Sequence, residues 1–469
     1  MRRALAIVGV LVFLLSLSSC LVGPNYKRPS VAAPPSYRGA TPDVAGSESA
    51  ASLGDEKWWN VFQDEELQKL VRTGLTQNFD VRIAATKIMQ AYEQVRITRA
   101  NGLPSVSAGP GFTGVRSPSI PGIFPGYSYL ADSLTASVSW NVDFWGRYRR
   151  ATEAARANLL QADWNRRAVI ATFVENLATA YFQLRALDSE LDIAKQTLAS
   201  RQQSLQLTET LERGGATSMV DVRQAQQLVE EAAEVIPDDE RQIAQTEDEI
   251  SILIGENPHN IPRGRKLEDQ PLPQTVPPGI PSQLLERRPD IQEAEQQLVA
   301  ANADIGVARA QLFPQISLTG QAGLESIGLG NLFVGTNRVW SFTSSLTQPI
   351  FEGGSLRANV RLAESQKQQY VLTYQQTIQT AFREVSDSLV AYGKYRDYRV
   401  HQEALTTAAR EAANLSEIRY RGGVTSYLEV LTNETTYFSA ELNLAQARLN
   451  ERLSLVQLYN ALGGGWQQS

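Results

Sequence analysis

The sequence is poor in the residues that carry most metal and redox chemistry. It has one cysteine and two histidines among 469 residues, so no disulfide can form within the chain. His259 lies in a proline-rich segment and His401 lies within a long helical stretch. Neither has cysteine or carboxylate neighbours at metal-ligand spacing. We therefore predict no metal site and no cofactor.

Motifs of enzymes and of nucleic-acid-binding proteins are missing as well. The sequence has no phosphate-binding glycine loop and no nucleophile elbow, so we expect that the protein is not an enzyme. The net charge is -6 and no run of lysine or arginine occurs, which argues against a nucleic-acid partner. The acidic run Asp238-Asp239-Glu240 follows Pro237, and we expect it to fill the first turn of a helix that restarts there.

The first residues have the pattern of a targeting segment. Two arginines precede the apolar stretch 4–17, which is too short to cross a bilayer as a permanent helix. Leu17-Ser18-Ser19-Cys20 resembles a bacterial lipobox, which predicts a lipoprotein signal peptide over residues 1–19 and a lipidated (palmitate-bearing) Cys20. The alternative is an ordinary signal peptide with an incidental cysteine. Residues 20–55 are rich in Pro, Ser, Ala and Gly, which predicts an extended arm.

The rest of the sequence contains two copies of one plan. Arg213-Gly214-Gly215-Ala216-Thr217-Ser218 matches Arg421-Gly422-Gly423-Val424-Thr425-Ser426, 208 positions later. Other short matches recur at nearly the same offset, so coincidence is implausible. We place the first repeat at 56–257, a proline-rich link at 258–289 and the second repeat at 290–469.

Each repeat contains a helix far longer than a globular domain needs. Residues 147–213 include no glycine or proline, and 355–421 are interrupted only by Gly393. At about 1.5 Å per residue, each would extend roughly 100 Å. Leucine recurs every seven residues from Leu177 to Leu205, as in the seam of a left-handed coiled coil. Such helices indicate a fibrous protein or a tall hollow assembly.

Four segments with alternating polarity favour the hollow assembly. We predict strands near 105–115, 133–144, 315–324 and 339–350, each with one apolar and one small polar face. This pattern is typical of transmembrane β-barrels, although four strands of a soluble sheet remain the alternative. Four strands are too few to close a barrel, and an open edge in lipid is forbidden. Three chains would supply twelve strands around a lumen, whereas the eight strands of a dimer would leave almost none.

Several motifs together resemble the TolC-type outer-membrane efflux channels, in their lipoprotein (nodulation-type and multidrug) subgroup. The resemblance covers the whole mature chain. It rests on Cys20-Leu21-Val22-Gly23-Pro24-Asn25-Tyr26-Lys27-Arg28-Pro29, Trp58-Trp59, Arg288-Pro289-Asp290-Ile291 and Gln348-Pro349-Ile350-Phe351-Glu352-Gly353-Gly354. It implies a mostly α-helical homotrimer with a twelve-stranded β-barrel in the outer membrane and an α-barrel in the periplasm. It also implies a passive duct for multidrug efflux that works with a periplasmic adaptor and an inner-membrane pump.

The repeated Arg-Gly-Gly motif marks the candidate functional site. Glycines permit the reversal between two helices, and a following Thr or Ser can cap the second one. The resemblance implies that the adaptor docks at these tips, through Arg213, Gly214, Gly215, Thr217, Arg421, Gly422, Gly423 and Thr425. It also implies that Asp221, Leu428, Glu429 and Thr432 line the periplasmic aperture. Three copies of each acid would favour cations there, although each could equally be a solvated surface carboxylate. Tyr420 and Tyr427 are candidates for gating or for simple packing.

Two alternative functions stay open at this point. An exit duct for type I protein secretion would have the same architecture and a different cargo. A non-porous coiled-coil lipoprotein would share the long helices but would have no use for four amphipathic strands.

Overall fold

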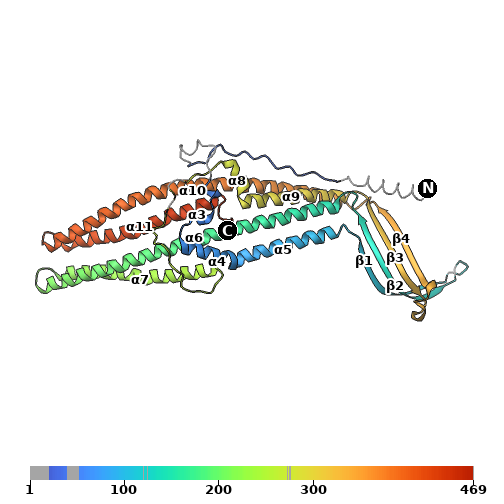
Figure 1. The fold of residues 1–469 in the computed structure, drawn as a ribbon, viewed down its shortest axis with the longest axis horizontal. Helices are drawn as coiled ribbons and strands as arrows, with labels where there is room; N and C mark the ends of the chain where they lie inside the picture. The colour runs from blue at the N-terminus through green and yellow to red at the C-terminus, as the bar shows by residue number, and fades with distance from the viewer. Residues whose placement is uncertain are drawn as a thin grey trace. The chain divides into compact units, whose positions relative to one another are not determined.

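The computed structural model describes residues 21–39, 52–119, 121–123, 125–271, 273 and 276–467. The predicted signal peptide and Cys20 lie outside these residues. The elements, labelled in Figure 1, are η1 (Leu53–Asp55), α3 (Trp58–Val61), α4 (Glu65–Gln77), α5 (Phe79–Ala100), β1 (Ser105–Ser117), β2 (Tyr127–Val142), α6 (Arg147–Arg213), α7 (Met219–Leu253), α8 (Pro281–Arg287), α9 (Pro289–Ala310), β3 (Gln315–Ser326), η2 (Leu329–Asn331), η3 (Gly335–Asn337), β4 (Arg338–Thr347), α10 (Ser355–Arg421) and α11 (Tyr427–Ala461).

The chain divides into two compact units. The first comprises Met1–Ser30, Lys87–Ala162 and Glu293–Tyr374, and the second comprises Val31–Thr86, Asp163–Gln292 and Gln375–Ser469. The first unit holds all four strands. The second holds most of the long helices together with the link between the repeats. None of the described helices has a stretch long and apolar enough to cross a membrane.

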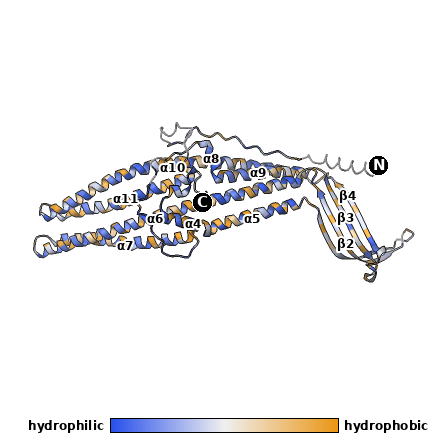
Figure 2. Cartoon of the chain, in the orientation of Figure 1, coloured by the Kyte–Doolittle hydropathy of each residue, from blue (hydrophilic) through white to orange (hydrophobic). Residues whose placement is uncertain are grey.

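The sheet of the first unit is antiparallel, with the strands in chain order β1-β2-β3-β4. Its register mostly places apolar residues opposite apolar residues and small polar residues opposite small polar residues. Leu134 pairs with Leu324 and Val142 pairs with Ile316, whereas Ser317 pairs with Ser345. The alternating colours of the strands in Figure 2 reflect this arrangement. The predicted two-faced strands are therefore confirmed.

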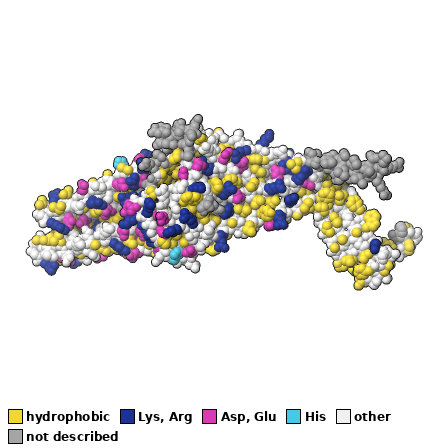
Figure 3. Space-filling view, viewed as in Figure 1, with side chains coloured by type: hydrophobic (Ala, Val, Ile, Leu, Met, Phe, Trp, Pro, Cys, Tyr) yellow, Lys and Arg dark blue, Asp and Glu magenta, His cyan; other side chains and the backbone are white. Residues whose placement is uncertain are grey.

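The apolar face of the sheet is exposed in the single chain. Phe112, Trp340 and Phe342 have 70%, 82% and 66% of their surface exposed. In Figure 3, apolar side chains cover much of the visible strand surface, and charged side chains gather on the helices. The opposite face is lined by serine, threonine and glutamine, and serine pairs bridge neighbouring strands, as in Ser107 with Ser137 at 2.8 Å.

Two strand boundaries differ from the prediction by three residues or more. β2 begins at Tyr127 rather than near residue 133, because it stays paired with β1 as far as Ser117. β4 ends at Thr347 rather than near residue 350. Pro349 follows at once, and proline has no N–H with which to continue a ladder.

The N-terminal arm docks onto the helices of the first unit. Arg150 of α6 is 2% exposed. It donates to the carbonyl oxygens of Val22 and Gly23 at 3.2 and 3.3 Å and to the Asn25 side chain at 2.9 Å. Further along the arm, Arg28 forms an ion pair with Glu295 of α9. These charge-assisted hydrogen bonds hold the arm at a fixed register on α6 and α9.

The second unit is built from two helical hairpins. The first hairpin consists of α6 and α7, and the second consists of α10 and α11. Both long helices contain 67 residues and both return helices contain 35, as a duplication requires. Contrary to the prediction, α7 does not restart at Pro237 but continues through it. The loss of one backbone hydrogen bond is tolerated because α7 is buried on both sides of the exposed Pro237, at Ala232 and at Asp239.

Candidate functional site

The first tip joins α6 to α7 through a tight reversal. Gly215 adopts a positive φ of +72°, and the N–H of Ala216 reaches back to the carbonyl of Leu211 at 2.8 Å. Ser218 then caps α7, because its Oγ accepts the Asp221 N–H at 3.4 Å while the Asp221 carboxylate accepts the Ser218 N–H at 3.3 Å. This reciprocal capping box gives hydrogen-bond acceptors to the backbone N–H groups of Ser218 and Asp221, which have no acceptor within the helix.

The second tip has the same backbone and different side-chain partners. Gly423 has a φ of +69°, and the Val424 N–H donates to the Arg419 carbonyl at 2.9 Å. Ser426 precedes α11 but its side chain makes no capping hydrogen bond. Glu429 instead accepts from the Thr425 hydroxyl and forms an ion pair with Arg419 at 3.1 Å.

One hydrogen bond and one apolar cluster join the two hairpins near the tips. The Thr217 hydroxyl donates to the Asp221 carboxylate, so the Tyr420 hydroxyl donates to Thr217 Oγ1, at 3.3 Å. The Tyr420 ring packs edge-on against Tyr427 with centroids 5.1 Å apart. Tyr427 is 1% exposed and packs with Ala225 and Leu228 of α7. Burial raises the pKa of Tyr427 to about 12, so it stays neutral.

The residues predicted to line the aperture fall into two groups, the two acids and the two exposed residues Leu428 and Thr432. The carboxylates of Asp221 and Glu429 form hydrogen bonds within their own turns, where each accepts from the hydroxyl of the threonine four residues before it. Leu428 is 56% exposed, and Thr432 is exposed with its hydroxyl donating to the Leu428 carbonyl at 2.9 Å.

The predicted docking residues stand at the exposed ends of the hairpins. Arg213 makes a 3.3 Å hydrogen bond to Thr210, and Arg421 pairs with Glu417. A Cβ on Gly215 or Gly423 would meet no atom of the described residues within 4 Å. Both glycines are therefore required by their positive φ and not by crowding.

Sequence reasoning missed a buried arginine above the tips. Arg201 of α6 is 2% exposed. It donates to the Leu228 carbonyl at 2.7 Å and to Glu231 at 3.1 Å, and its guanidinium lies 4.8 Å from the centre of the Phe438 ring in α11. The sequence alone could have indicated that Arg201 is buried. It lies three residues after Leu198, at the second apolar position of the coiled-coil heptad, where a charged residue is unusual.

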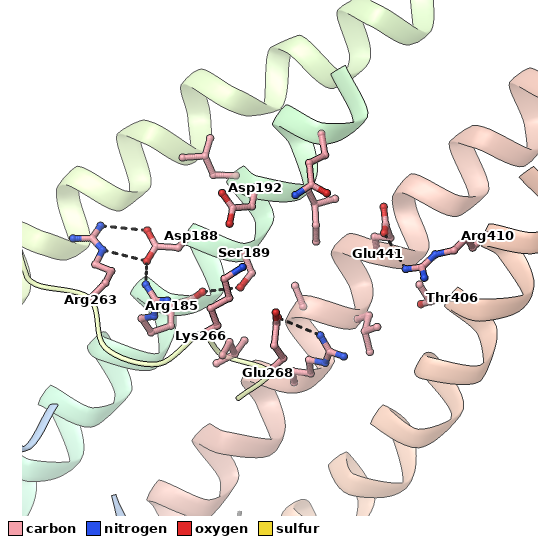
Figure 4. A pocket seen from close by; sticks show the side chains of 17 residues that line it. Arg185, Asp188, Ser189, Asp192, Arg263, Lys266, Glu268, Thr406, Arg410 and Glu441 are labelled. Atoms are coloured by element: carbon pink, nitrogen blue, oxygen red, sulfur yellow. Dashed lines mark hydrogen bonds and ion pairs between the residues drawn. The ribbon is translucent and has the colours of Figure 1, made fainter. Parts of the chain in front are cut away.

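A polar cavity of about 630 Å³ lies where the link meets both hairpins (Figure 4). Its walls are held by ion pairs. In Figure 4, Arg263 of the link and Arg185 of α6 converge on Asp188, at 3.2 and 2.5 Å. Glu268 of the link reaches Arg448 of α11 at 3.6 Å. These pairs tie the link to both hairpins.

Comparisons with known proteins identify the family. The sequence matches the outer membrane efflux protein family twice, over residues 70–256 and over residues 280–464. The chain belongs to the outer membrane efflux protein family. The two matches coincide with the two repeats of the sequence.

Individual relatives agree over nearly the whole chain. Outer membrane protein OprJ of Pseudomonas aeruginosa is 36% identical, with 100% of this chain and 98% of OprJ covered. The toluene efflux pump outer membrane protein TtgC of Pseudomonas putida is also 36% identical, with 100% and 97% covered. The solved open state of the Neisseria gonorrhoeae MtrE outer membrane channel is 31% identical, with a TM-score of 0.86 over 96% of this chain and 99% of MtrE.

These findings confirm the resemblance drawn from the motifs. The protein is an outer-membrane channel for efflux, with its helical hairpins in the periplasm. Its relatives are channels and not enzymes. The alternative interpretation as a non-porous coiled-coil lipoprotein is wrong. Of the two remaining interpretations, the relatives support efflux and not type I protein secretion.

Proposed function

We propose that three copies of the chain assemble into one passive duct, with the four strands of each chain completing a shared twelve-stranded barrel. The observation that carries this proposal is the open sheet. Within the described residues, β1 and β4 each pair with a strand on one side only. In a bilayer, each unpaired backbone group at such an edge costs several kilocalories per mole, so the edges must meet other strands. Three chains close the ring and leave a lumen, whereas two chains would nearly fill it.

The mass of the detergent-extracted protein tests this assembly. Light scattering, corrected for bound detergent, should give the mass of three mature chains, and the same preparation should form conducting channels in planar bilayers. A folded monomer in detergent would contradict the shared barrel. Because such a channel can rest closed, only a trimer that never opens in long recordings would contradict the duct while leaving the assembly intact.

We propose further that a periplasmic adaptor docks on the two tips and connects the duct to an inner-membrane pump, which supplies the energy. The exposed ends carry Arg213 and Arg421 beside Gly214, Gly215, Gly422 and Gly423, and no side chain of the described residues covers the two turn glycines at 215 and 423. Such a surface offers a partner both backbone groups and guanidinium donors.

Cross-linking in cells tests the docking surface. The sequence has a single cysteine, Cys20, so an introduced cysteine would be the only free thiol of the lipidated protein. Arg421→Cys should cross-link to the adaptor. Lys69→Cys is the matched control, because Lys69 is equally exposed and is likewise paired with a glutamate in its own helix. Equal cross-linking at both positions would contradict docking at the tips.

The cargo of this duct is proposed to be small molecules, including drugs and apolar solvents. TtgC, at 36% identity, is named for a toluene efflux pump, and a passive duct leaves most of the selection to its pump. We propose that the chain itself catalyses no reaction. Deleting the gene should lower the tolerance of the host for the compounds that the pump exports. Unchanged tolerance, in a strain whose other outer-membrane efflux channels are deleted, would contradict this role.

A further inference from the structure

The strands of the sheet contain very few charged residues, and these lie together at one end. Between residues 105 and 142 and between residues 315 and 347, the cations are Arg116 and Arg338 and the acids are Asp132 and Glu325. Each lies in the half of its strand that is farther from the helix joined to that strand. Because the helical hairpins are periplasmic, these halves are the outer ones.

Both arginines point to the apolar face of the sheet. Side chains two or four residues apart on a strand share a face. Arg116 therefore shares the face of Phe112 on β1, and Arg338 shares the face of Trp340 on β4. Glu325 pairs with a serine of the polar face and lies on the opposite side. The apolar face, exposed in the single chain (Figure 3), is the surface of this outer-membrane channel that contacts lipid.

Neither guanidinium group has a partner within the chain. Arg116 and Arg338 are exposed, and their side chains form no hydrogen bond or ion pair with any described residue. Asp132, the one acid of the strands on this face, is paired with neither of them. An arginine on the lipid-facing surface of a barrel is costly near the bilayer centre and is tolerated only near the membrane surface.

The spacing along the strands places both arginines near the outer membrane surface. Arg338 lies eight residues from Leu346 on β4, which is about 27 Å along a strand and about 21 Å across a membrane at a tilt of about 40°. Arg116 lies ten residues from Val106 on β1, which gives about 26 Å in the same way. The apolar band of such barrels is about 25 Å tall, so both guanidinium groups lie at its outer boundary.

The surroundings of the two arginines suit a lipid with an acidic headgroup. On the periplasmic side of Arg338, Trp340 and Phe342 are largely exposed and can contact acyl chains. Arg116 pairs across the strands with Ser128, whose hydroxyl is a further hydrogen-bond donor. The planar guanidinium group fits phosphate oxygens with two parallel hydrogen bonds. The loops beyond, residues 118–126 and 327–337, contain no charged residue that could compete.

We propose that Arg116 and Arg338 bind the phosphate groups of the phosphorylated glycolipid (lipopolysaccharide) that forms the outer leaflet of the outer membrane. The apolar side chains next to them contact the acyl chains of the same lipid. Bound phosphate supplies the negative charge that the chain itself does not place beside the two guanidinium groups. The site needs only the sheet of one chain, so its failure would leave the expected mass of the trimer unchanged.

The first test compares two lipids on the wild-type protein and needs no variant. Purified lipid A with both phosphates, and the same lipid A after removal of its phosphates, are titrated onto the full-length protein in a neutral detergent, and bound copies are counted by native mass spectrometry. The phosphorylated lipid should bind at least about tenfold more tightly, because each charge-assisted hydrogen bond contributes that much or more. Equal binding of the two lipids would show that only the acyl chains are recognised, and would overturn the proposal.

The second test removes the two guanidinium groups together. The double variant Arg116→Gln, Arg338→Gln should bind phosphorylated lipid A at least about tenfold more weakly than the wild type. The matched control is Arg223→Gln with Arg383→Gln, which makes the same change of charge at exposed positions on α7 and α10 and should bind as the wild type does. Unchanged binding in the first double variant, or an equal loss in the control, would overturn the proposal.

A conservative variant keeps this test decisive if the glutamine variant does not fold. Arg116→Lys with Arg338→Lys retains both charges but lacks the planar fork, so it should bind phosphorylated lipid A more weakly than the wild type and still prefer it to the dephosphorylated lipid. Loss of that preference while the wild type retains it would also support phosphate recognition by these residues. Binding equal to that of the wild type, in a lysine variant, would overturn the role of the guanidinium fork.

The third test identifies the source of the phosphate. Phosphatidylglycerol offers a phosphate and acyl chains without the sugars of the outer-leaflet glycolipid, and it should displace lipid A from the wild type only in large excess. Lipid extracted together with the wild type from outer membranes should include lipid A, and the glutamine double variant should retain much less of it. Equal affinity for phosphatidylglycerol would mean that the site takes phospholipid, and would overturn the assignment to the outer leaflet.

Discussion

The hydrogen bond between Tyr420 and Thr217 connects the two hairpins at their tips, and removing it should favour an open channel. Tyr420→Phe deletes the hydroxyl that donates to Thr217 Oγ1 at 3.3 Å. It keeps the ring that packs against Tyr427, with 5.1 Å between centroids. The turn at each tip is unaffected, since its hydrogen bonds lie within one hairpin. Only the restraint on separation of the hairpins is lost.

The magnitude follows from the type of bond. A neutral hydrogen bond contributes about 1 kcal/mol net, which changes a two-state equilibrium by roughly fivefold. If the three proposed copies open together, the three losses multiply to roughly a hundredfold. The ion pair between Arg419 and Glu429 has a shorter contact, 3.1 Å, but it is half-exposed and lies within the second hairpin. Its loss should loosen one tip without separating the hairpins.

Single-channel conductance in planar bilayers measures the effect. Wild-type channels should stay mostly closed, and Tyr420→Phe channels should be open for a much larger fraction of the time. Tyr437→Phe is the matched control. Its hydroxyl donates to Glu441 at 2.5 Å and accepts from Arg410 at 2.9 Å, and all three residues belong to the second hairpin.

The two variants together decide the outcome. Tyr437→Phe removes the stronger contacts of the two tyrosines, so an opening effect caused by general loosening would be larger there. If Tyr420→Phe channels behave as wild type does, or if Tyr437→Phe opens the channel equally, the contact between the hairpins is not the restraint and our reasoning fails.

Three further outcomes are expected. Asp64→Ala should lower the free energy of unfolding by about 3 kcal/mol or more, measured by thermal unfolding. The buried carboxylate accepts from the Tyr181 hydroxyl and the Gln270 amide, and it caps α4. A loss below about 1 kcal/mol would contradict this. Cys20→Ser should abolish labelling by radioactive palmitate, and retained label would place the lipid elsewhere. Asp221→Asn combined with Glu429→Gln should weaken the cation preference of the conductance several-fold, and unchanged selectivity would mean that these acids serve only their tips.

The sequence predicted those parts of the fold that depend on local pattern. The bounds of α6 and α10 follow from long stretches that contain no proline, and no glycine except Gly393, and that end at a glycine pair. The faces of the strands follow from alternation alone. β2 was predicted too short because Tyr127 and Tyr129 precede the run of clear alternation, and only pairing with β1 shows that they belong to the strand.

The parts that the sequence did not predict depend on contacts between distant residues. Nothing in the sequence around Asp64 shows that its carboxylate joins α4 to α6 and to the link. Pro237 was expected to interrupt α7, because the packing that retains it in the helix comes from other segments.

The two tips show where the duplicated halves have stopped being equivalent. Their glycine turns are the same, yet Arg419, Tyr420 and Tyr427 correspond to Leu211, Glu212 and Met219 at the offset of 208. Both aromatic rings that hold the hairpins together therefore come from the second repeat. The first repeat contributes only the acceptor Thr217 and the apolar surface of α7.

This asymmetry has a mechanical consequence. The first tip is complete in itself, because the Ser218 and Asp221 capping box satisfies its helix start. The second tip lacks such a box and relies on Arg419 and on its contacts with the first hairpin. Breaking the contacts between the hairpins thus leaves the first tip intact and frees the second. We therefore expect α10 and α11 to be the pair that moves when the channel opens, and hydrogen exchange in Tyr420→Phe should rise in residues 415–432 and stay unchanged in residues 207–224.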